Sequence, residues 1–191
     1  MNIGVLGGSF DPVHNAHLQM AETALKEFHF DKIIFVPAYV PPHKFKLVAC
    51  ETDRYNMLLS VIKDIEQYEI DTYEIDSKKS VFSCEMLDYL QSKHKNDNIK
   101  MLIGADSFNS IHLWKNTEYI VKKYGFVVFP RPNIKIDTES PYYKYCLFSN
   151  TVMKDISSTD IRNCLKNKKS ILKYVPKQVF EYIKKKNLYN E

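Results

Sequence analysis

The first seventeen residues constrain the fold more than any other part of the chain. Residues 3–6 form a short apolar run that predicts a buried β-strand. Gly7-Gly8 follows the run, and we expect these glycines to let the backbone turn tightly beside a ligand. Asp11-Pro12 marks a loop, and from about Asn15 the chain is expected to be helical. The opening therefore predicts a strand, a ligand-facing loop and a helix.

Two histidines, His14 and His17, stand three positions apart at the start of the expected helix. Because a helix turns by about 100° per residue, their rings lie roughly 60° apart and can face one ligand. Unpaired N–H groups and the helix dipole attract anions there, and phosphate is the expected guest. As hydrogen-bond donors or as cations, the imidazoles would stabilise charge that grows on phosphate oxygens. Histidines that only cap and pack are the alternative, but the compound motif favours function.

The next elements extend this opening into a βαβ unit. Apolar residues recur at helical spacing between Leu18 and Phe28, and residues 33–36 are a candidate second strand. A right-handed crossover would pair the two strands in parallel, with the ligand outside their carboxyl ends. The proline-rich residues 37–44 leave the second strand at that end, so we expect a shaped loop holding His43 and Lys44 over phosphates. A rigid connector is the alternative.

Later segments repeat the alternation of apolar strands and helices. A helix is expected after Asp53, which would cap it, and another over residues 83–94. Further strands are expected over residues 68–76, 99–103, 126–129 and 146–148. The tail ends in an amphipathic helix that carries Val179, Phe180 and Ile183.

Polar residues follow the later strands at their carboxyl ends. Gly104 and Asp106 come directly after residues 99–103, and Arg131 follows residues 126–129 between two prolines. These side chains are expected at the same sheet edge as His14. Trp114, the only tryptophan, has a flat face that could stack on a base, although a lone tryptophan is more often part of the core.

The segment of residues 155–162 combines hydroxyls with a guanidinium. Its serines and threonine resemble helix caps, and Arg162 lies about one turn inside the expected helix. Capping explains Ser158 or Thr159, but it does not require an arginine at that spacing. A guanidinium is the side chain best suited to bidentate binding of phosphate, so we expect Arg162 to bind one.

Composition excludes several classes of protein. With 191 residues and 45% hydrophobic content, the chain is expected to form one globular domain over residues 1–191. No apolar run approaches a membrane span and no basic leader precedes the first strand, so we expect a cytoplasmic protein without a membrane partner. Four widely spaced cysteines suggest neither a disulfide framework nor a metal site. The lysine-rich tail lacks a nucleic-acid-binding motif, so a solvated surface is favoured over nucleic-acid binding.

These motifs together resemble a known family. The run from Gly7 to His17 is similar to the signature of the H-x-G-H nucleotidyltransferases. With Pro41-Pro42-His43-Lys44 and residues 156–162, the likeness to bacterial nicotinate-mononucleotide adenylyltransferases covers nearly the full length. The resemblance implies an α/β fold, namely a Rossmann-like doubly wound parallel sheet flanked by helices with a small helical carboxyl-terminal part. It also implies adenylyl transfer from ATP, accompanied by Mg²⁺, to nicotinate mononucleotide in NAD biosynthesis, giving deamido-NAD and pyrophosphate.

The resemblance further implies roles for single residues. The catalytic residues would be His14, His17 and Arg162. ATP would be bound by Gly8, Ser9, Phe10, His14, His17, Gly104, Ile156, Ser157, Ser158 and Arg162. The acceptor would be bound by Lys44, Ser83, Asp106, Trp114 and Arg131. Two positions depart from the family pattern: Ala16 replaces the glycine between the histidines, and Phe82-Ser83 replaces an aromatic residue followed by threonine.

The nicotinate form of the acceptor is expected to be preferred over the nicotinamide form. Ser83 at a helix start offers an amide and a hydroxyl to a carboxylate, and no acidic side chain occurs between Val81 and Cys84.

No Walker P-loop, G-x-G-x-x-G fingerprint or nucleophile elbow occurs in the sequence. Direct in-line attack of one bound phosphate on another is therefore the economical mechanism. One alternative is an adenylyltransferase acting on nicotinamide mononucleotide or phosphopantetheine. Another is a noncatalytic nucleotide-sensing or nucleic-acid-binding module, against which the complete histidine pair argues. The oligomeric state stays open, a homo-oligomer included.

Overall fold

Six parallel strands form the centre of the computed structural model, which describes residues 1–40 and 47–190. They are β1 (Asn2–Gly8), β2 (Lys32–Pro37), β3 (Tyr68–Ile70), β4 (Asn98–Gly104), β5 (Phe126–Phe129) and β6 (Cys146–Phe148). Their order in the sheet is β3-β2-β1-β4-β5-β6, and every adjacent pair is parallel. This is the order of a doubly wound Rossmann-like sheet, so the predicted fold class is confirmed.

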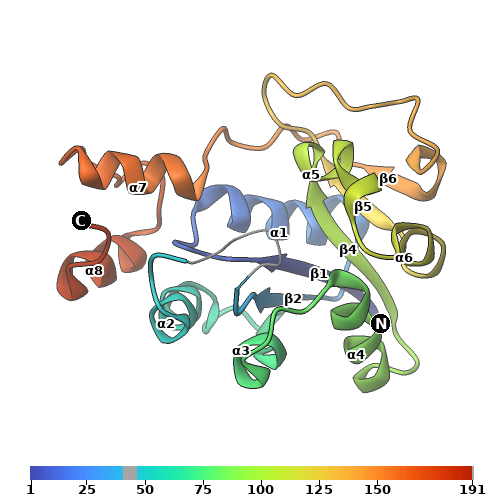
Figure 1. The fold of residues 1–191 in the computed structure, drawn as a ribbon, viewed down its shortest axis with the longest axis horizontal. Helices are drawn as coiled ribbons and strands as arrows, with labels where there is room; N and C mark the ends of the chain where they lie inside the picture. The colour runs from blue at the N-terminus through green and yellow to red at the C-terminus, as the bar shows by residue number, and fades with distance from the viewer. Residues whose placement is uncertain (41–46, 191) are drawn as a thin grey trace.

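Helices connect the strands and cover the sheet (Figure 1). They are α1 (Asn15–Phe28), α2 (Glu51–Ile62), α3 (Tyr73–Ser77), α4 (Ser83–Lys93), α5 (Ala105–Asn109), α6 (Thr117–Lys123), α7 (Ser158–Lys166) and α8 (Lys177–Lys186). Two short 3₁₀ turns are η1 (Ile111–Leu113) and η2 (Tyr143–Tyr145). Helices α7 and α8 form the expected helical carboxyl-terminal part, and α8 packs against α2.

Both faces of the sheet are buried. In β2, Ile33 and Phe35 join a core on one face, whereas Ile34 and Val36 join a second core on the other. Helices α1, α2 and α8 cover the first core, and α4, α5 and α6 cover the second. Successive side chains point to opposite faces, so a strand covered on both sides is apolar throughout. Each fully buried aliphatic side chain contributes about 1.5–3 kcal/mol to folding.

The strand order reverses between β1 and β4. Strand β1 lies between two strands in the sheet. One is β2, the next strand in sequence, and the other is β4. Connections therefore leave the two strands in opposite directions, which opens a crevice outside their carboxyl ends. The polar segments after β1, β4 and β5 all lie at this edge.

The predicted third strand was too long. Only Tyr68–Ile70 pairs with β2, and Tyr73–Ser77 is the helix α3. The Asp71 carboxylate accepts a hydrogen bond from the Tyr73 amide at 2.9 Å, which starts the helix directly after the strand.

The predicted cap of α2 was also wrong. Cys50 occupies the N-cap and Asp53 lies in the first turn, where an acidic side chain complements the helix dipole. The Asp53 carboxylate instead accepts a hydrogen bond from the Tyr182 hydroxyl of α8 at 2.8 Å. The residue thus joins two helices rather than capping one.

The turn after β1 is not made by its glycines. Gly7 and Gly8 belong to the strand and have no left-handed backbone angle. The turn is made at Phe10, whose φ is 47°, an uncommon conformation for a residue other than glycine. The Phe10 side chain is buried in the core and holds this backbone in place.

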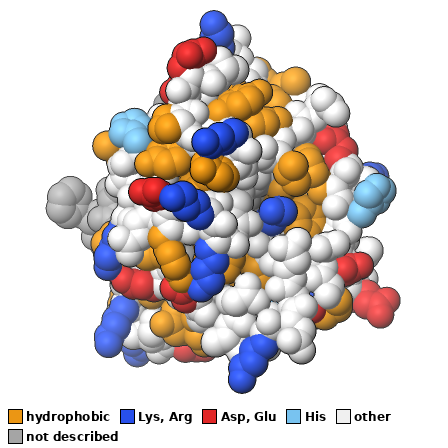
Figure 2. All heavy atoms as spheres, turned by 90° about the vertical axis from the view of Figure 1, so that its right-hand side faces the viewer, with side chains coloured by type: hydrophobic (Ala, Val, Ile, Leu, Met, Phe, Trp, Pro, Cys, Tyr) orange, Lys and Arg blue, Asp and Glu red, His pale blue; other side chains and the backbone are white. Residues whose placement is uncertain are grey.

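Surface charge is mixed at one end of the molecule and basic on α8. On the face shown in Figure 2, Lys and Arg side chains are interspersed with acidic and hydrophobic ones. On α8, Lys184, Lys185 and Lys186 are exposed while Val179 and Ile183 are buried. In the part of the chain that the structure describes, no helix has the length and apolar character needed to cross a membrane.

Candidate active site

A cavity of about 770 Å³ lies at the carboxyl edge of the sheet, where the strand order reverses. It brings together segments that are far apart in the sequence. Of the residues that the sequence singled out, those lining it are Gly8, Ser9, Phe10, His14, His17, Ser83, Gly104, Asp106, Trp114, Arg131, Ser157, Ser158 and Arg162. Lys44, expected at the acceptor, lies outside the described residues.

The two histidines form a stacked pair in the cavity wall. Their ring centroids lie 3.6 Å apart with an interplanar angle of 20°. His14 is the N-cap of α1, and its backbone N–H donates to Nδ1 of His17 at 3.2 Å. A neutral imidazole whose Nδ1 accepts a hydrogen bond carries its proton on Nε2, so His17 presents a donor at Nε2. Phe10 packs edge-on against the His17 ring, with centroids 5.0 Å apart.

Both imidazoles are neutral at physiological pH. Burial and then the positive charge of Arg131 lower the pKa of His14 from 6.5 to about 3. Burial, the neighbouring His14 and Arg131 lower the pKa of His17 well below its usual value. Of the two roles open from the sequence, this favours hydrogen-bond donation over a resident cation. Nδ1 of His14 is buried and has no hydrogen-bond partner among the residues that the structure describes.

We expect neither imidazole to become protonated between pH 8 and pH 5 in the ligand-free protein. NMR titration of the ring resonances of His14 and His17 would test this, with a histidine-containing peptide in the same buffer as reference. The unfolded chain takes up protons on these histidines below about pH 6.5, whereas the folded protein does not. The pair should therefore lower the free energy of unfolding as the pH falls from 6.5 towards 3. A ring that titrates near pH 6.5 would contradict the expected burial.

Asp11 fixes the loop between β1 and α1. Its carboxylate is 2% exposed, and Oδ2 accepts a hydrogen bond from the Val48 amide at 2.9 Å. Oδ1 accepts from the Ala49 amide at 3.1 Å and from the Tyr189 hydroxyl at 2.8 Å. Two distant segments, residues 48–49 and Tyr189, thus donate to one buried carboxylate. The sequence placed Asp11 in the loop motif but did not indicate this role.

The start of α7 is fastened to the same loop. Ser157 is its N-cap, and Oγ accepts a hydrogen bond from the Asp160 amide at 3.1 Å. A cap in this segment was predicted, but Ser158 and Thr159, to which capping was assigned, lie inside the helix. The Ser158 hydroxyl donates to the Pro12 carbonyl at 3.0 Å. The amide end of a helix and the loop before α1 therefore form one wall of the cavity.

Arg162 lies one turn into α7 and reaches the loop as well. Nη1 donates to the Asp11 carbonyl at 2.6 Å, and Nη2 donates to the Thr159 hydroxyl at 3.2 Å. A guanidinium has five N–H donors, so these two contacts orient the group and leave donors for an anion in the cavity.

A second basic group stands at the β4 and β5 ends. Nε of Arg131 lies 3.2 Å from Oδ1 of Asp106, so the two side chains form the pair that the sequence placed at this edge. A Cβ at position 104 would lie 2.4 Å from Oδ1 of Asp106 and 3.0 Å from Nε of Arg131. Gly104 therefore leaves the space that this pair occupies.

The remaining predicted acceptor residues come from α4 and the segment after α5. Ser83 is the first residue of α4 and lines the cavity. Trp114 also lines it, while its ring packs edge-on against Phe126 with centroids 6.0 Å apart. Trp114 is thus both part of the scaffold and exposed to the cavity.

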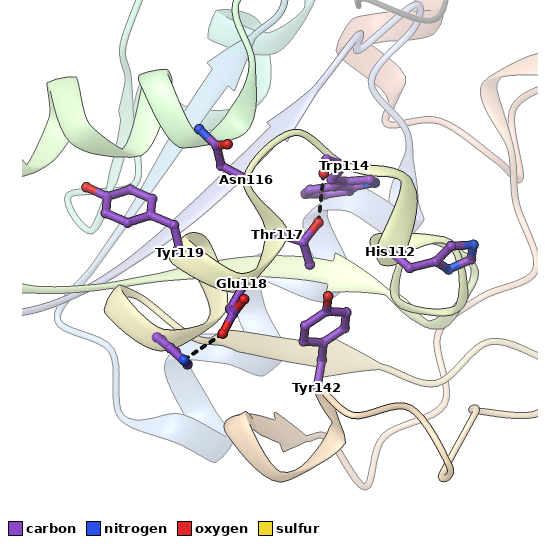
Figure 3. A pocket seen from close by; sticks show the side chains of 8 residues that line it. His112, Trp114, Asn116, Thr117, Glu118, Tyr119 and Tyr142 are labelled. Atoms are coloured by element: carbon purple, nitrogen blue, oxygen red, sulfur yellow. Dashed lines mark hydrogen bonds and ion pairs between the residues drawn. The ribbon is translucent and has the colours of Figure 1, made fainter.

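A second hollow of about 580 Å³, also lined by Trp114, lies elsewhere on the surface (Figure 3). Thr117 donates to the Trp114 carbonyl at 2.8 Å, and Glu118 pairs with Lys122 across its rim. Apart from Trp114, this hollow contains none of the residues that the sequence singled out.

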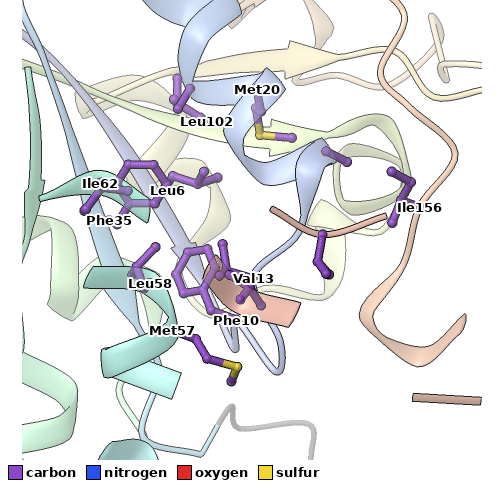
Figure 4. Close-up of a cluster of buried hydrophobic side chains, with 14 of the residues drawn as sticks. Leu6, Phe10, Val13, Met20, Phe35, Met57, Leu58, Ile62, Leu102 and Ile156 are labelled. Carbon is purple, nitrogen blue, oxygen red and sulfur yellow. The ribbon is translucent and has the colours of Figure 1, made fainter. Parts of the chain in front are cut away.

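The side chain of Ile156 does not line the cavity. It is buried in the core, in the cluster that also holds Val13, Phe10 and Met57 (Figure 4). Its apolar side chain supports the loop and α7 from behind.

Three charged residues in or beside the cavity were missed, namely Arg54, Glu74 and Lys115. Arg54 is 1% exposed, and it donates to the Ser9 carbonyl at 2.7 Å and to the Tyr39 carbonyl at 3.0 Å. Glu74 lines the cavity from α3, and burial raises its pKa to about 7. Arg54 stands among the apolar residues of α2, which is only a weak sequence signal of a buried role. Glu74 was missed because its segment was assigned to the third strand rather than to α3.

Comparison with known proteins identifies the family. A family model described as cytidylyltransferase-like matches residues 5–164. A Clostridium tetani protein named "Probable nicotinate-nucleotide adenylyltransferase" is 37% identical over 97% of each chain. A protein of the same name from Endomicrobium trichonymphae is 38% identical over 98% of each chain. The chain belongs to the nicotinate-nucleotide adenylyltransferase family.

Solved structures share the fold. The Plasmodium falciparum nicotinic acid mononucleotide adenylyltransferase complexed with NaAD has a TM-score of 0.81 at 24% identity, covering 99% of this chain and 97% of that one. The same enzyme complexed with APC has a TM-score of 0.80 at 23% identity, with the same coverage. The recognition made from the sequence motifs is confirmed.

One departure from the family pattern has a simple structural outcome. Ala16 replaces the glycine between the histidines, and its methyl group is buried in the core against which α1 packs. Ala16 does not line the cavity, so the added methyl takes no space from a ligand.

Proposed function

We propose that this protein transfers the adenylyl group of ATP to nicotinate mononucleotide, producing deamido-NAD and pyrophosphate. The observation that carries the proposal is one cavity lined by the histidine pair and Arg162 together with Ser83 and Arg131. Such a cavity has groups for a triphosphate and groups for a second anionic ligand. The names of the relatives support the choice of acceptor.

The reaction needs no protein nucleophile. A phosphate oxygen of the mononucleotide attacks the α-phosphorus of ATP, the bond from that phosphorus to the bridging oxygen breaks, and pyrophosphate leaves. His14 and His17 contact the phosphates, and Nε2 of His17 donates to an oxygen on which charge grows. Arg162 holds the β- and γ-phosphates with its remaining N–H groups. Catalysis then consists of positioning and charge stabilisation.

The other predicted site residues take supporting roles in this proposal. Gly8, Ser9, Phe10 and Gly104 border the nucleotide, and Ser157 and Ser158 present the start of α7 to its adenosine side. Ile156 contributes only through its backbone, since its side chain is buried in the core. Asp106, Trp114 and Arg131 surround the acceptor. A role for Lys44 there stays an expectation from the sequence.

Magnesium enters this proposal with the substrate, as MgATP. Among the residues that the structure describes, no group of three or more His, Cys, Asp or Glu side chains is placed to hold a metal ion. Mg²⁺ usually keeps several waters and binds through substrate phosphates with one or two carboxylates. The side chains around the cavity fit an ion that the triphosphate carries into the site. That ion neutralises part of the negative charge of the triphosphate.

A pyrophosphate-release assay with ATP and a panel of acceptors tests the proposal. We expect nicotinate mononucleotide to be used roughly ten- to a hundredfold better than nicotinamide mononucleotide, and phosphopantetheine not to be used. The amide NH₂ would face donors meant for a carboxylate, which costs about 1–3 kcal/mol. Equal or better use of the nicotinamide form would contradict the acceptor assignment. Nucleotide binding without pyrophosphate release would favour a noncatalytic module.

A further inference from the structure

An acidic side chain that the proposed mechanism does not use lies in the wall of the same cavity. Glu74 in α3 is 6% exposed and lines the cavity. Its Oε2 atom is buried and has no hydrogen-bond partner among the residues that the structure describes. A buried carboxyl oxygen without a partner is costly, unless a ligand supplies the missing hydrogen bond.

Residues proposed to bind the acceptor line the same cavity as Glu74. Ala38 after β2 and residues 81–83 at the start of α4 line the cavity together with Glu74. Ser83, proposed to meet the carboxylate of the acceptor, is among them. The sequence has no acidic side chain between residues 81 and 84, but the fold brings the carboxyl group of Glu74 into the same cavity.

The electrostatic surroundings of Glu74 favour an uncharged carboxyl. Burial raises its pKa to about 7, while the Tyr39 amide and the positive charge of Arg54 in α2 act in the opposite direction. Arg54 directs its guanidinium at the Ser9 and Tyr39 carbonyls rather than pairing with Glu74. The other charged or titratable groups lining the cavity are His14, His17, Asp106, Lys115, Arg131 and Arg162. A bound carboxylate near Glu74 would favour its neutral form further, since like charges repel.

We propose that Glu74 selects the acceptor by donating a hydrogen bond from its neutral carboxylic acid to the carboxylate of nicotinate mononucleotide. No proton leaves Glu74 in this step. The ionised form repels that carboxylate and accepts a hydrogen bond from the NH₂ group of the nicotinamide form. The inference rests on the proposed function and names the group that discriminates between acceptors.

The test is the ratio of kcat/KM for nicotinate mononucleotide to that for nicotinamide mononucleotide, measured from pH 6 to pH 8.5. The two acceptors carry the same phosphate, and their ring substituents do not titrate in this range, so their own ionisation cancels in the ratio. The preference is expected to fall roughly tenfold as Glu74 ionises, since a hydrogen bond to a charged group is lost.

Glu74→Gln is the decisive variant. Glutamine keeps the shape and a donor but cannot ionise, so the ratio should stay at its low-pH level throughout the range. Asp76→Asn changes an exposed acid on the same helix and should leave the pH dependence unchanged. Glu74→Met removes both the donor and the titrating group, so the ratio should be independent of pH and lie below the low-pH level of the wild type.

The outcomes separate this inference from the proposed function. If nicotinate mononucleotide is adenylylated but the wild-type ratio is constant with pH, the inference about Glu74 is wrong and the function stands. The same holds if Glu74→Gln keeps the wild-type pH dependence. If no pyrophosphate is released with either acceptor, the proposed function itself fails. The wild-type profile decides the matter even if the variants do not fold.

Discussion

Replacing His17 with alanine is expected to lower turnover by roughly 10²–10³, the usual effect of removing one donor to developing negative charge. The hydrogen bond from the His14 amide leaves Nε2 of His17 as the donor, and alanine has none. The free energy of unfolding should fall by about 1–3 kcal/mol, because alanine removes the acceptor for the His14 amide and the ring contacts with His14 and Phe10. The measurements are kcat at saturating ATP and acceptor, and urea unfolding of the same preparation.

His112→Ala provides the matched control. His112 is exposed and does not line the cavity, so its removal should leave turnover unchanged. His17→Asn, which restores a donor on a shorter side chain, should recover part of the lost rate. A folded His17→Ala protein with nearly normal turnover would refute the assignment of His17 to the transition state.

Arg162→Lys is expected to lower kcat/KM for ATP by roughly ten- to a hundredfold. The charge survives, but an ammonium cannot reproduce a planar fork, and a hydrogen bond to a charged group contributes about 1.5–3 kcal/mol. The variant also loses one of the two oriented contacts, to the Asp11 carbonyl or to the Thr159 hydroxyl. The KM for nicotinate mononucleotide should change little.

The reverse reaction gives an independent measure of the same role. If Arg162 holds the β- and γ-phosphates, the KM for pyrophosphate in the reaction with deamido-NAD should rise by a similar factor. Lys166→Arg, on an exposed position of the same helix, is the control for changes to α7. An unchanged ATP dependence in Arg162→Lys would mean that the arginine serves only to fasten α7 to the loop.

Much of the sheet could be predicted from the sequence because its central strands are buried on both faces. Such strands are continuous apolar runs, so residues 33–36, 99–103 and 126–129 were placed correctly. Because the strands are parallel, the residues that follow each of them all lie at the carboxyl edge of the sheet. The rule predicted Asp106 and Arg131 at the same edge, and the structure shows in addition that they form an ion pair.

The remainder depended on contacts that leave no local pattern. Residues 68–76 alternate weakly, and the end of β3 is set by the Asp71 side chain rather than by hydrophobic periodicity. Glu74 therefore looked like part of a strand, whereas a helix carries it into the cavity. No spacing rule indicates that the N-cap of α2 is Cys50 rather than Asp53.

The Asp11 loop also has a consequence for the order of events during synthesis. The loop is made well before the tyrosine that binds its carboxylate, which is 178 positions further along the chain. At about 5–20 residues per second, the ribosome needs roughly 10–40 s to cover that distance. A growing chain can pair β1 with β2 and form α1 early, since those contacts are close in sequence. The histidine signature is then carried on a loop that still lacks the Tyr189 hydroxyl, so the site reaches its final form only after Tyr189 has been made.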